Sequence, residues 1–295
     1  MRLREITMGL AAAAALALPA HAASDWNAVG KALGKTGSVQ PGGVYRVGLP
    51  RSDLKVTLDG VAIKPALALG SWVAFRDMGG GQAMVMGDLV LTHAEVNPVM
   101  SALETGGIQI TALHNHLLRS SPATMYMHID GHGDAVKLAT ALHAALARSK
   151  TPLGAAPPAP PPAPLALDTA KLDQILGAKG AANGGVYQFT IPRAEAPKAD
   201  GMAIPPSMGS GIAINFQPTG GGKAAITGDF VLTADEVNPV IRALRAGGIE
   251  VTAIHNHMLD DEPRLFFMHF WANADAVKLA TGLRQALDHV KVAGR

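Results

Sequence analysis

Apolar and polar residues alternate with period two along a nine-residue stretch that occurs twice in the chain. The first copy, 108–116, reads Ile-Gln-Ile-Thr-Ala-Leu-His-Asn-His, and the second, 249–257, reads Ile-Glu-Val-Thr-Ala-Ile-His-Asn-His. A period of two is typical of a β-strand, whose successive side chains point to opposite faces. We therefore expect a strand in each copy, with His114 and His116 on the same face as Ile108 and Ile110.

The repetition extends well beyond this stretch. Residues 87–116 and 228–257 align without a gap and are identical at 20 of 30 positions. Further alternating segments predict strands, and the glycine triplets at 79–81 and 220–222 predict tight hairpin turns, since glycine tolerates positive φ. The sequence indicates an α+β fold made by tandem duplication.

Helix signals also occur in both copies. The Thr-x-x-Glu patterns that begin at Thr92 and Thr233 fit a capping box, in which side chains satisfy the free amides of a first helical turn. Apolar residues with helical spacing predict closing helices from Ala135 to Arg148 and from Ala276 to Val290. With a short helix at its start, each repeat should be an antiparallel sheet with two to three helices.

The start of the chain resembles an export signal. Residues 1–23 carry two arginines, a short apolar run and an Ala-His-Ala cleavage pattern. Residues 24–150 form the first predicted repeat and 166–295 the second. Residues 151–165 are rich in alanine and proline, which is typical of a semi-rigid extended linker. We expect a periplasmic protein secreted through a cleaved signal peptide.

Composition narrows the classes of partner. The chain has 295 residues, 48% of them hydrophobic, and no cysteine, which excludes disulfides, thiolate metal sites and a lipidated cysteine. Lys and Arg number 25 against 23 Asp and Glu, so no polybasic surface for nucleic acid is indicated. We expect no nucleic-acid partner, no membrane anchor, and a monomer in which the two repeats form a pseudo-twofold pair.

Histidine provides the main candidate chemistry. A third histidine follows each His-Asn-His on the next predicted strand, which gives one set per repeat: His114, His116 and His128, then His255, His257 and His269. Two imidazoles at i and i+2 of a strand and one from its neighbour can hold a transition metal, zinc being favoured. The alternative is that they are core histidines hydrogen-bonded to backbone or to Asn115 and Asn256.

Two carboxylates recur near the predicted clusters. Glu95 and Glu236 could act as general bases on a metal-bound water, although the capping boxes explain the same residues. Asp88 and Asp229 are open to a similar double interpretation, because Gly-Asp is also a common turn sequence. Copper is a further alternative, since several methionines lie near the predicted site, although alternation places Met127 opposite His128.

The motifs resemble those of the LppY/LpqO family, bacterial exported proteins that share a domain of unknown function. The resemblance rests on Gly-Asp-x-Val-Leu-Thr-x-x-Glu-Val-Asn-Pro-Val, on Gly-Gly-Ile-x-x-Thr-Ala-x-His-Asn-His and on the later Met-His, found in 87–128 and again in 228–269. It covers both repeats and implies export but no settled activity.

These observations lead to three functional hypotheses. The first is a metal-binding protein, as a metal-dependent hydrolase or lyase, acting on an unidentified small-molecule or cell-envelope ligand. The second is a non-catalytic module that binds a ligand or partner and uses its histidines structurally. The third is periplasmic copper handling.

Overall fold

The computed structural model describes residues 23–154 and 164–294, and both repeats have the predicted α+β architecture. The first repeat has the elements α1 (Trp26–Leu33), β1 (Ser38–Gln40), β2 (Val44–Pro50), β3 (Thr57–Leu58), β4 (Val61–Ala62), α2 (Pro65–Ala68), β5 (Gly70–Gly79), β6 (Gln82–Thr92), α3 (His93–Thr105), β7 (Gln109–His114), β8 (Thr124–Asp134) and α4 (Ala135–Leu146). The second has α5 (Thr169–Leu176), β9 (Ala181–Asn183), β10 (Val186–Ile191), β11 (Lys198–Ala199), β12 (Met202–Ala203), the 3₁₀ turn η1 (Pro206–Met208), β13 (Ile212–Gly220), β14 (Lys223–Leu232), α6 (Ala234–Ala246), β15 (Glu250–His255), β16 (Asp261–Glu262), β17 (Phe266–Asp275) and α7 (Ala276–Leu287).

Each repeat forms a six-stranded sheet of the same topology. The strand order is β1-β2-β5-β6-β8-β7 in the first sheet and, read in the same sense, β9-β10-β13-β14-β17-β15 in the second. Every pairing is antiparallel, and the glycine triplets turn β5 into β6 and β13 into β14 as expected. The tandem duplication is therefore visible strand by strand.

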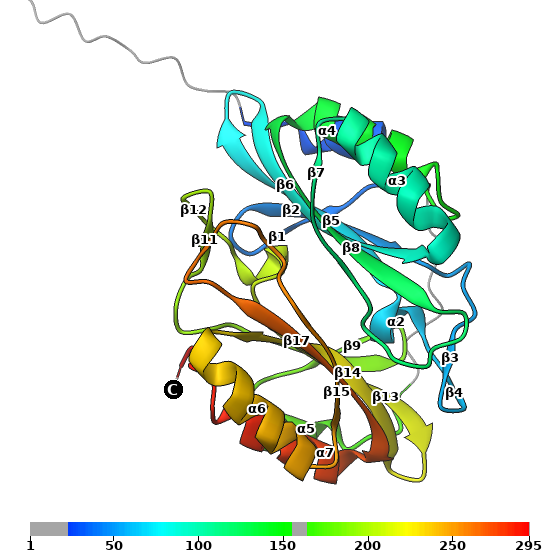
Figure 1. Ribbon diagram of the computed structural model, residues 1–295, viewed down its shortest axis with the longest axis vertical. Coiled ribbons are helices and arrows are strands. Elements are labelled where there is room, and N and C mark those ends of the chain that lie inside the picture. Colours follow the sequence, from blue (N-terminus) through cyan, green and yellow to red (C-terminus); the bar gives the residue numbers. More distant parts are fainter. Residues whose placement is uncertain (1–22, 155–163, 295) are drawn as a thin grey trace, which may run out of the picture.

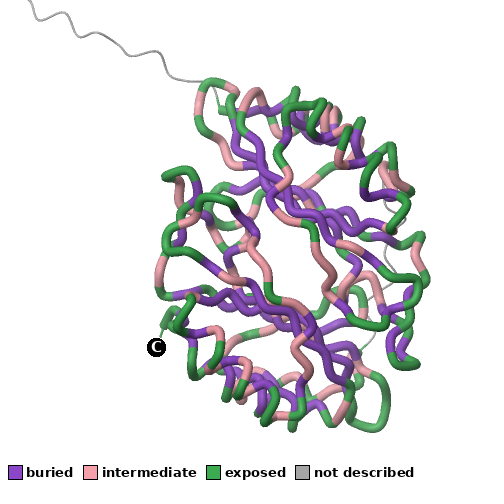
Figure 2. Tube along the Cα trace, in the orientation of Figure 1, coloured by how far each residue is buried: buried purple, intermediate pink, exposed green. Residues whose placement is uncertain are grey.

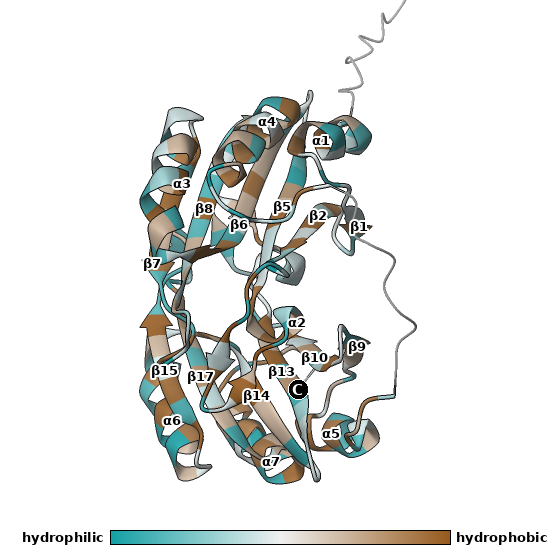
Figure 3. Ribbon diagram, turned by 90° about the vertical axis from the view of Figure 1, so that its right-hand side faces the viewer, coloured by the Kyte–Doolittle hydropathy of each residue, from teal (hydrophilic) through white to brown (hydrophobic). Residues whose placement is uncertain are grey.

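The two sheets face one another, and the longer helices cover their outer faces (Figure 1). Helices α1, α3 and α4 lie on the first sheet, and α5, α6 and α7 lie on the second. Strands β7 and β15, each an edge strand, approach one another on one side of the molecule (Figure 3). The buried segments follow the central strands of both sheets (Figure 2).

Capping residues fix the helix starts. Thr92 and Glu95 form the expected capping box at α3, and Thr233 and Glu236 form the same box at α6. Pro98 lies inside α3, so this helix begins at the capping box and continues through the proline. The closing helices end at Leu146 and Leu287, slightly before the predicted ends.

Apolar side chains form a core beneath the helices of each repeat. In the first repeat, Phe75, Leu89 and Leu103 pack between the sheet and its helices. The second core extends across the space between the sheets to Met84 and Met86. Met84 and Met86 of the first repeat therefore pack into the core of the second repeat, and this packing joins the inner faces of the two sheets.

Two predicted segments lie wholly or mostly outside the described residues. The export signal falls almost entirely in 1–22, and the alanine-proline linker falls mostly in 155–163. Within the described part of the chain, no helix has the length and apolar character needed to span a bilayer.

Candidate metal centre

The histidine strands carry a β-bulge that changes which face the histidines share. In β7, Ile110 pairs with Ile129, but Ala112 pairs with His128, so Thr111 is the extra residue. Ile108 and Ile110 therefore face the helices, whereas Ala112 and His114 face the other sheet. The prediction that the histidines share a face with these isoleucines is wrong, because alternation fails at the bulge. Strand β15 has the same irregularity between Val251 and Ala253.

Each His-Asn-His segment is held by the other repeat. The Thr252 hydroxyl donates to the His116 carbonyl at 2.6 Å, and the Thr111 hydroxyl donates to the His257 carbonyl. The Asn256 amide donates to the Thr111 carbonyl at 2.9 Å, and the Asn115 amide donates to the Thr252 carbonyl at 3.3 Å. The bulged threonines and the asparagines thus bind the two repeats together.

All six histidines lie in one cluster. The rings of His114 and His255 stack with centroids 3.4 Å apart, those of His116 and His269 lie 3.6 Å apart, and those of His128 and His257 lie 3.8 Å apart. Every one of these pairs joins one repeat to the other. The expectation of a separate cluster in each repeat is therefore wrong, because the two edge strands meet and bring both sets together.

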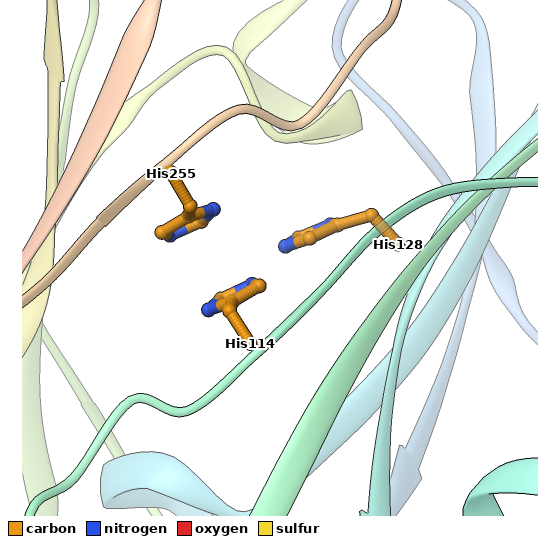
Figure 4. A group of neighbouring side chains, drawn as sticks. All are labelled: His114, His128 and His255. Carbon is orange, nitrogen blue, oxygen red and sulfur yellow. The ribbon is translucent and has the colours of Figure 1, made fainter.

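Sets of potential metal ligands cross the same boundary. Nitrogen atoms of His114, His128 and His255 lie within 4.8 Å of one another, and so do those of His114, His116 and His269. Figure 4 shows the first set: the ring of His128 points toward the stacked rings of His114 and His255.

Backbone carbonyls fix the tautomer of three imidazoles. The Nδ1 atom of His114 lies 3.1 Å from the Asn115 carbonyl, that of His255 lies 3.0 Å from the Asn256 carbonyl, and that of His269 lies 2.7 Å from the Gly228 carbonyl. A carbonyl only accepts, so Nδ1 must carry the proton. In a neutral ring, Nε2 then has a free lone pair, and Nε2 is the atom that can bind a metal ion.

The Nε2 atoms of the six histidines are buried and lack a hydrogen-bond partner among the described residues. His257 Nε2 lies 3.2 Å from Asp229 Oδ2, yet without the geometry of a hydrogen bond. A buried polar atom without a partner costs about 1–3 kcal/mol. Six such atoms directed into one space are a feature that core packing alone does not explain.

Burial also keeps these imidazoles neutral. It lowers the pKa of His114 and of His255 to about 4 and that of His269 to about 3. The pKa values of His116, His128 and His257 fall well below the usual value, first because of burial and then because of the neighbouring histidines. Only neutral imidazole binds a metal ion, so the cluster is in its ligating form at neutral pH.

Two aspartates complete the cluster. Asp88 pairs with His128 across β6 and β8, and Asp229 pairs with His269 across β14 and β17. Both lie within strands, so the turn interpretation of Gly-Asp is wrong. Burial, aided by the charge of Asp229, raises the pKa of Asp88 to about 8, and burial likewise raises that of Asp229.

Glu95 and Glu236 lie elsewhere and have other partners. Both carboxylate oxygens of Glu95 accept from the buried Arg51 guanidinium, at 2.9 and 3.1 Å, and further bonds come from the amides of Thr92 and Lys150. Arg193 binds Glu236 in the same way. Neither glutamate occurs in the groups of potential metal ligands within the described chain. Their catalytic role stays a prediction, while the structure shows them as helix caps in buried ion pairs.

A cleft of about 1040 Å³ leads to the cluster from between the sheets. Asp88, Asp229, His116, His257 and His269 contribute to its wall. The guanidinium of Arg46 stacks on Trp72 near this wall, 3.9 Å from the ring centroid. Arg46 and Trp72 were not predicted as site residues, because neither recurs in the second repeat.

One protein family matches the chain twice, at residues 27–148 and 170–289. Its description is Domain of Unknown Function (DUF1259). The chain belongs to this family. Both copies of the domain therefore contribute histidines to the cluster, and each copy contributes three.

Three solved structures show weak similarity. They are the trimeric bacterial microcompartment shell protein PduB (12% identity, 84% of this chain and 89% of that chain, TM-score 0.19), EtuB from Clostridium kluyveri (8%, 85% and 88%, 0.20) and the ethanolamine utilization protein EutL from Leptotrichia buccalis (11%, 74% and 81%, 0.18). No curated protein matches the chain.

Proposed function

We propose that the chain binds a divalent transition metal, zinc being favoured, at one centre shared by its two repeats. The observation that carries this proposal is the set of six buried Nε2 atoms without hydrogen-bond partners among the described residues. A bound cation would coordinate the free lone pairs of the imidazoles nearest to it, and its charge would be balanced by the buried carboxylates of Asp88 and Asp229.

His143 illustrates what a structural histidine looks like in the same chain. Its Nδ1 lies 2.9 Å from the Leu33 carbonyl at the end of α1, and Arg284 takes the matching place in the second repeat by donating to the Leu176 carbonyl. That position accepts a different side chain because only a hydrogen bond to the helix end is needed. The six clustered histidines differ from His143, because their Nε2 atoms are buried without a hydrogen-bond partner among the described residues.

The donor set suits zinc among the common ions. Neutral imidazoles with one carboxylate are its ordinary ligands in proteins, whereas hard cations such as calcium prefer oxygen alone. Two further ligand sets within 4.8 Å include a carboxylate, namely Asp88 with His116 and His128, and Asp229 with His255 and His257. Histidines of both repeats would hold the ion, and the aspartates would balance its charge.

A hydrolase or lyase is the enzymatic form of this proposal. When bound, zinc acts as a Lewis acid toward an oxygen of a substrate. Asp88 and Asp229 lie beside the clustered histidines, and either carboxylate could take up or release a proton there. The cleft of about 1040 Å³ supports access of a small molecule to these groups. The proposal also includes export of the protein to the periplasm and its membership of the LppY/LpqO family.

A non-catalytic ligand-binding module is the second candidate. The observation in its favour is the same cleft, whose wall also contains Trp72, Gln188 and Asn215, side chains that can bind a ligand without metal. It requires the histidines to be structural and so leaves their free Nε2 atoms unexplained.

Elemental analysis of full-length protein purified without chelator tests the proposal. We expect near-stoichiometric zinc, copper or nickel in the native protein and none in a variant with His114, His116, His255 and His257 changed to alanine. The variant His143→Ala is the matched control and should retain the metal. Absence of metal from the native protein, even after reconstitution, would exclude the proposal and favour the ligand-binding module.

A further inference from the structure

A second group of carboxylates and imidazole lies apart from the histidine centre. Asp130 and His132 follow His128 at every second position of β8, so their side chains share its inner face. Asp200 lies in the turn between β11 and β12, which belongs to the second repeat. One ligand atom of each of these three residues lies within 4.8 Å of those of the others.

Asp130 is the member that suggests a ligand. The residue is only 7% exposed, its Oδ2 has no hydrogen-bond partner among the described residues, and its Oδ1 lies 3.7 Å from His132 Nδ1. A buried carboxylate oxygen without a partner is costly, because its desolvation is not repaid. Its approach to a second carboxylate, that of Asp200, increases the cost.

The pseudo-twofold relation provides an internal comparison. His128 and His269 are 141 positions apart, and the same offset relates the turn aspartates Asp59 and Asp200, both of which have a positive φ (47° and 48°). Asp59 therefore occupies in the first repeat the place that Asp200 occupies in the second. Each turn aspartate faces the long strand of the other repeat.

Asp59 is neutralised by protein donors. Trp271, the counterpart of Asp130, donates its indole N–H to Asp59 at 3.0 Å. Arg119 binds Asp59 through two hydrogen bonds, at 3.1 and 2.9 Å, and also binds Glu250. At this end of the molecule, an arginine supplies the positive charge between carboxylates.

The matching residues at the other end reverse this arrangement. Applying the same offset, Asp130 replaces Trp271, His132 replaces Asn273, and Asp260 stands where the first repeat has Arg119. Thus the donors around Asp59 become acceptors around Asp200. Arg76 of β5 donates to the Ala203 carbonyl, and no ion pair joins it to Asp130 or Asp200 among the described contacts.

We propose that Asp130, His132 and Asp200 bind a divalent cation, of the manganese or zinc class, that links the two repeats. Carboxylate and imidazole ligands together suit such ions. The cation takes the electrostatic place that Arg119 has at the opposite end. Because one ligand comes from the second repeat and two from the first, binding of the ion stabilises their association.

Manganese binding tests this site with the histidine centre disabled. In full-length His116→Ala/His255→Ala protein, in which every ligand set of the histidine cluster is broken, electron paramagnetic resonance should show one saturable Mn²⁺ site. Adding Asp200→Asn should weaken binding at least tenfold, while Asp59→Asn, the pseudo-equivalent change, should leave it unaltered. Asparagine tolerates a positive φ, so Asp200→Asn should still fold, and the thermal unfolding midpoint without metal verifies this.

The same proteins provide a second measurement. Mn²⁺ should raise the thermal unfolding midpoint of the double-histidine variant, and this increase should disappear in the Asp200→Asn form. The proposal is overturned by the absence of saturable binding, or by binding that Asp200→Asn and Asp130→Asn both leave unchanged. Because the histidine centre is disabled in all these proteins, the result does not depend on the proposed function.

Discussion

Two kinds of buried polar group occur in this protein, and their hydrogen bonds differ. Arg51 and Glu95 are buried as a pair in which both carboxylate oxygens are occupied, and Arg51 also binds Asp53 and the Val90 carbonyl. The six clustered imidazoles are buried with their Nε2 atoms free. Both kinds of group recur in the two repeats, so recurrence does not distinguish a structural residue from a functional one. The state of their hydrogen bonds does distinguish them.

The pH dependence of stability should show the largest difference between the two kinds of group. The pKa values of His114 and His255 are lowered by burial to about 4 and that of His269 to about 3, against 6.5 in the unfolded chain. The unfolded state then binds more protons below pH 6.5, so stability is present above that pH and is lost as the pH falls. Each pKa unit corresponds to about 1.4 kcal/mol, so these three groups alone should remove roughly 5 kcal/mol by pH 5.

Asp88 contributes to the pH dependence of stability with the opposite sign. The pKa of Asp88 is raised to about 8 by burial, so its contribution is fully present below pH 3.8 and is lost as the pH rises through 8. Urea unfolding of metal-free protein in chelator should therefore give maximal stability near pH 6.5, with a decline toward pH 8 as Asp88 ionises. A variant with His114, His255 and His269 changed to glutamine should lose a large part of the acid dependence, and His116, His128 and His257 should carry the rest. Stability that stays constant from pH 7 to pH 5 would contradict the buried, neutral state of the cluster.

Breaking a satisfied ion pair should cost somewhat less. Arg51→Ala leaves the Glu95 carboxylate buried without its cation, which typically costs about 3–5 kcal/mol. Equilibrium urea unfolding measures this loss, and Arg193→Ala should give a similar value in the second repeat because Arg193 binds Glu236 alike.

Activity, measured beside metal content and stability, distinguishes this structural role from the catalytic one predicted for the glutamates. Folded Glu95→Gln protein should retain as much metal as the native chain and the same activity, once an activity is known. Loss of activity with intact stability and metal content would instead support Glu95 as a base.

The smallest effect is expected at the single histidine bonded to a helix end. His143→Ala removes one hydrogen bond to the Leu33 carbonyl, worth about 1 kcal/mol. Arg284→Ala should cost a similar amount in the second repeat, and neither change should alter metal content. A loss of metal in His143→Ala would show that histidines outside the cluster also take part.

Local patterns predicted most of the fold. Alternation, glycine triplets and the Thr-x-x-Glu boxes identified the long strands, the hairpins and the starts of α3 and α6, because these features depend on neighbouring residues. The bulges at Thr111 and Thr252 were not predicted, since an extra residue in a strand leaves no mark on composition. They decide which face of β7 and β15 the histidines occupy.

The histidines of the candidate site were predicted from the sequence, but their arrangement in one cluster was not. The sequence identified the six histidines as candidates, yet it could not show that β7 and β15 approach one another, because that contact depends on how two complete sheets pack. Asp88 and Asp229 could have been favoured over Glu95 and Glu236, since each lies inside a long apolar run where an unpaired charge is expensive. The recurrent Pro-Arg at 50–51 and 192–193 was an available indication of a partner for the glutamates.

The central claim is that both repeats build one metal centre, and half-site variants test it most directly. We would measure metal per chain by elemental analysis in full-length native protein, in His114→Ala/His116→Ala and in His255→Ala/His257→Ala. A shared centre predicts that either double variant loses all tightly bound metal, because an ion held between the repeats needs histidines of both. Retention of half of the metal in each double variant would show two independent sites and contradict the account.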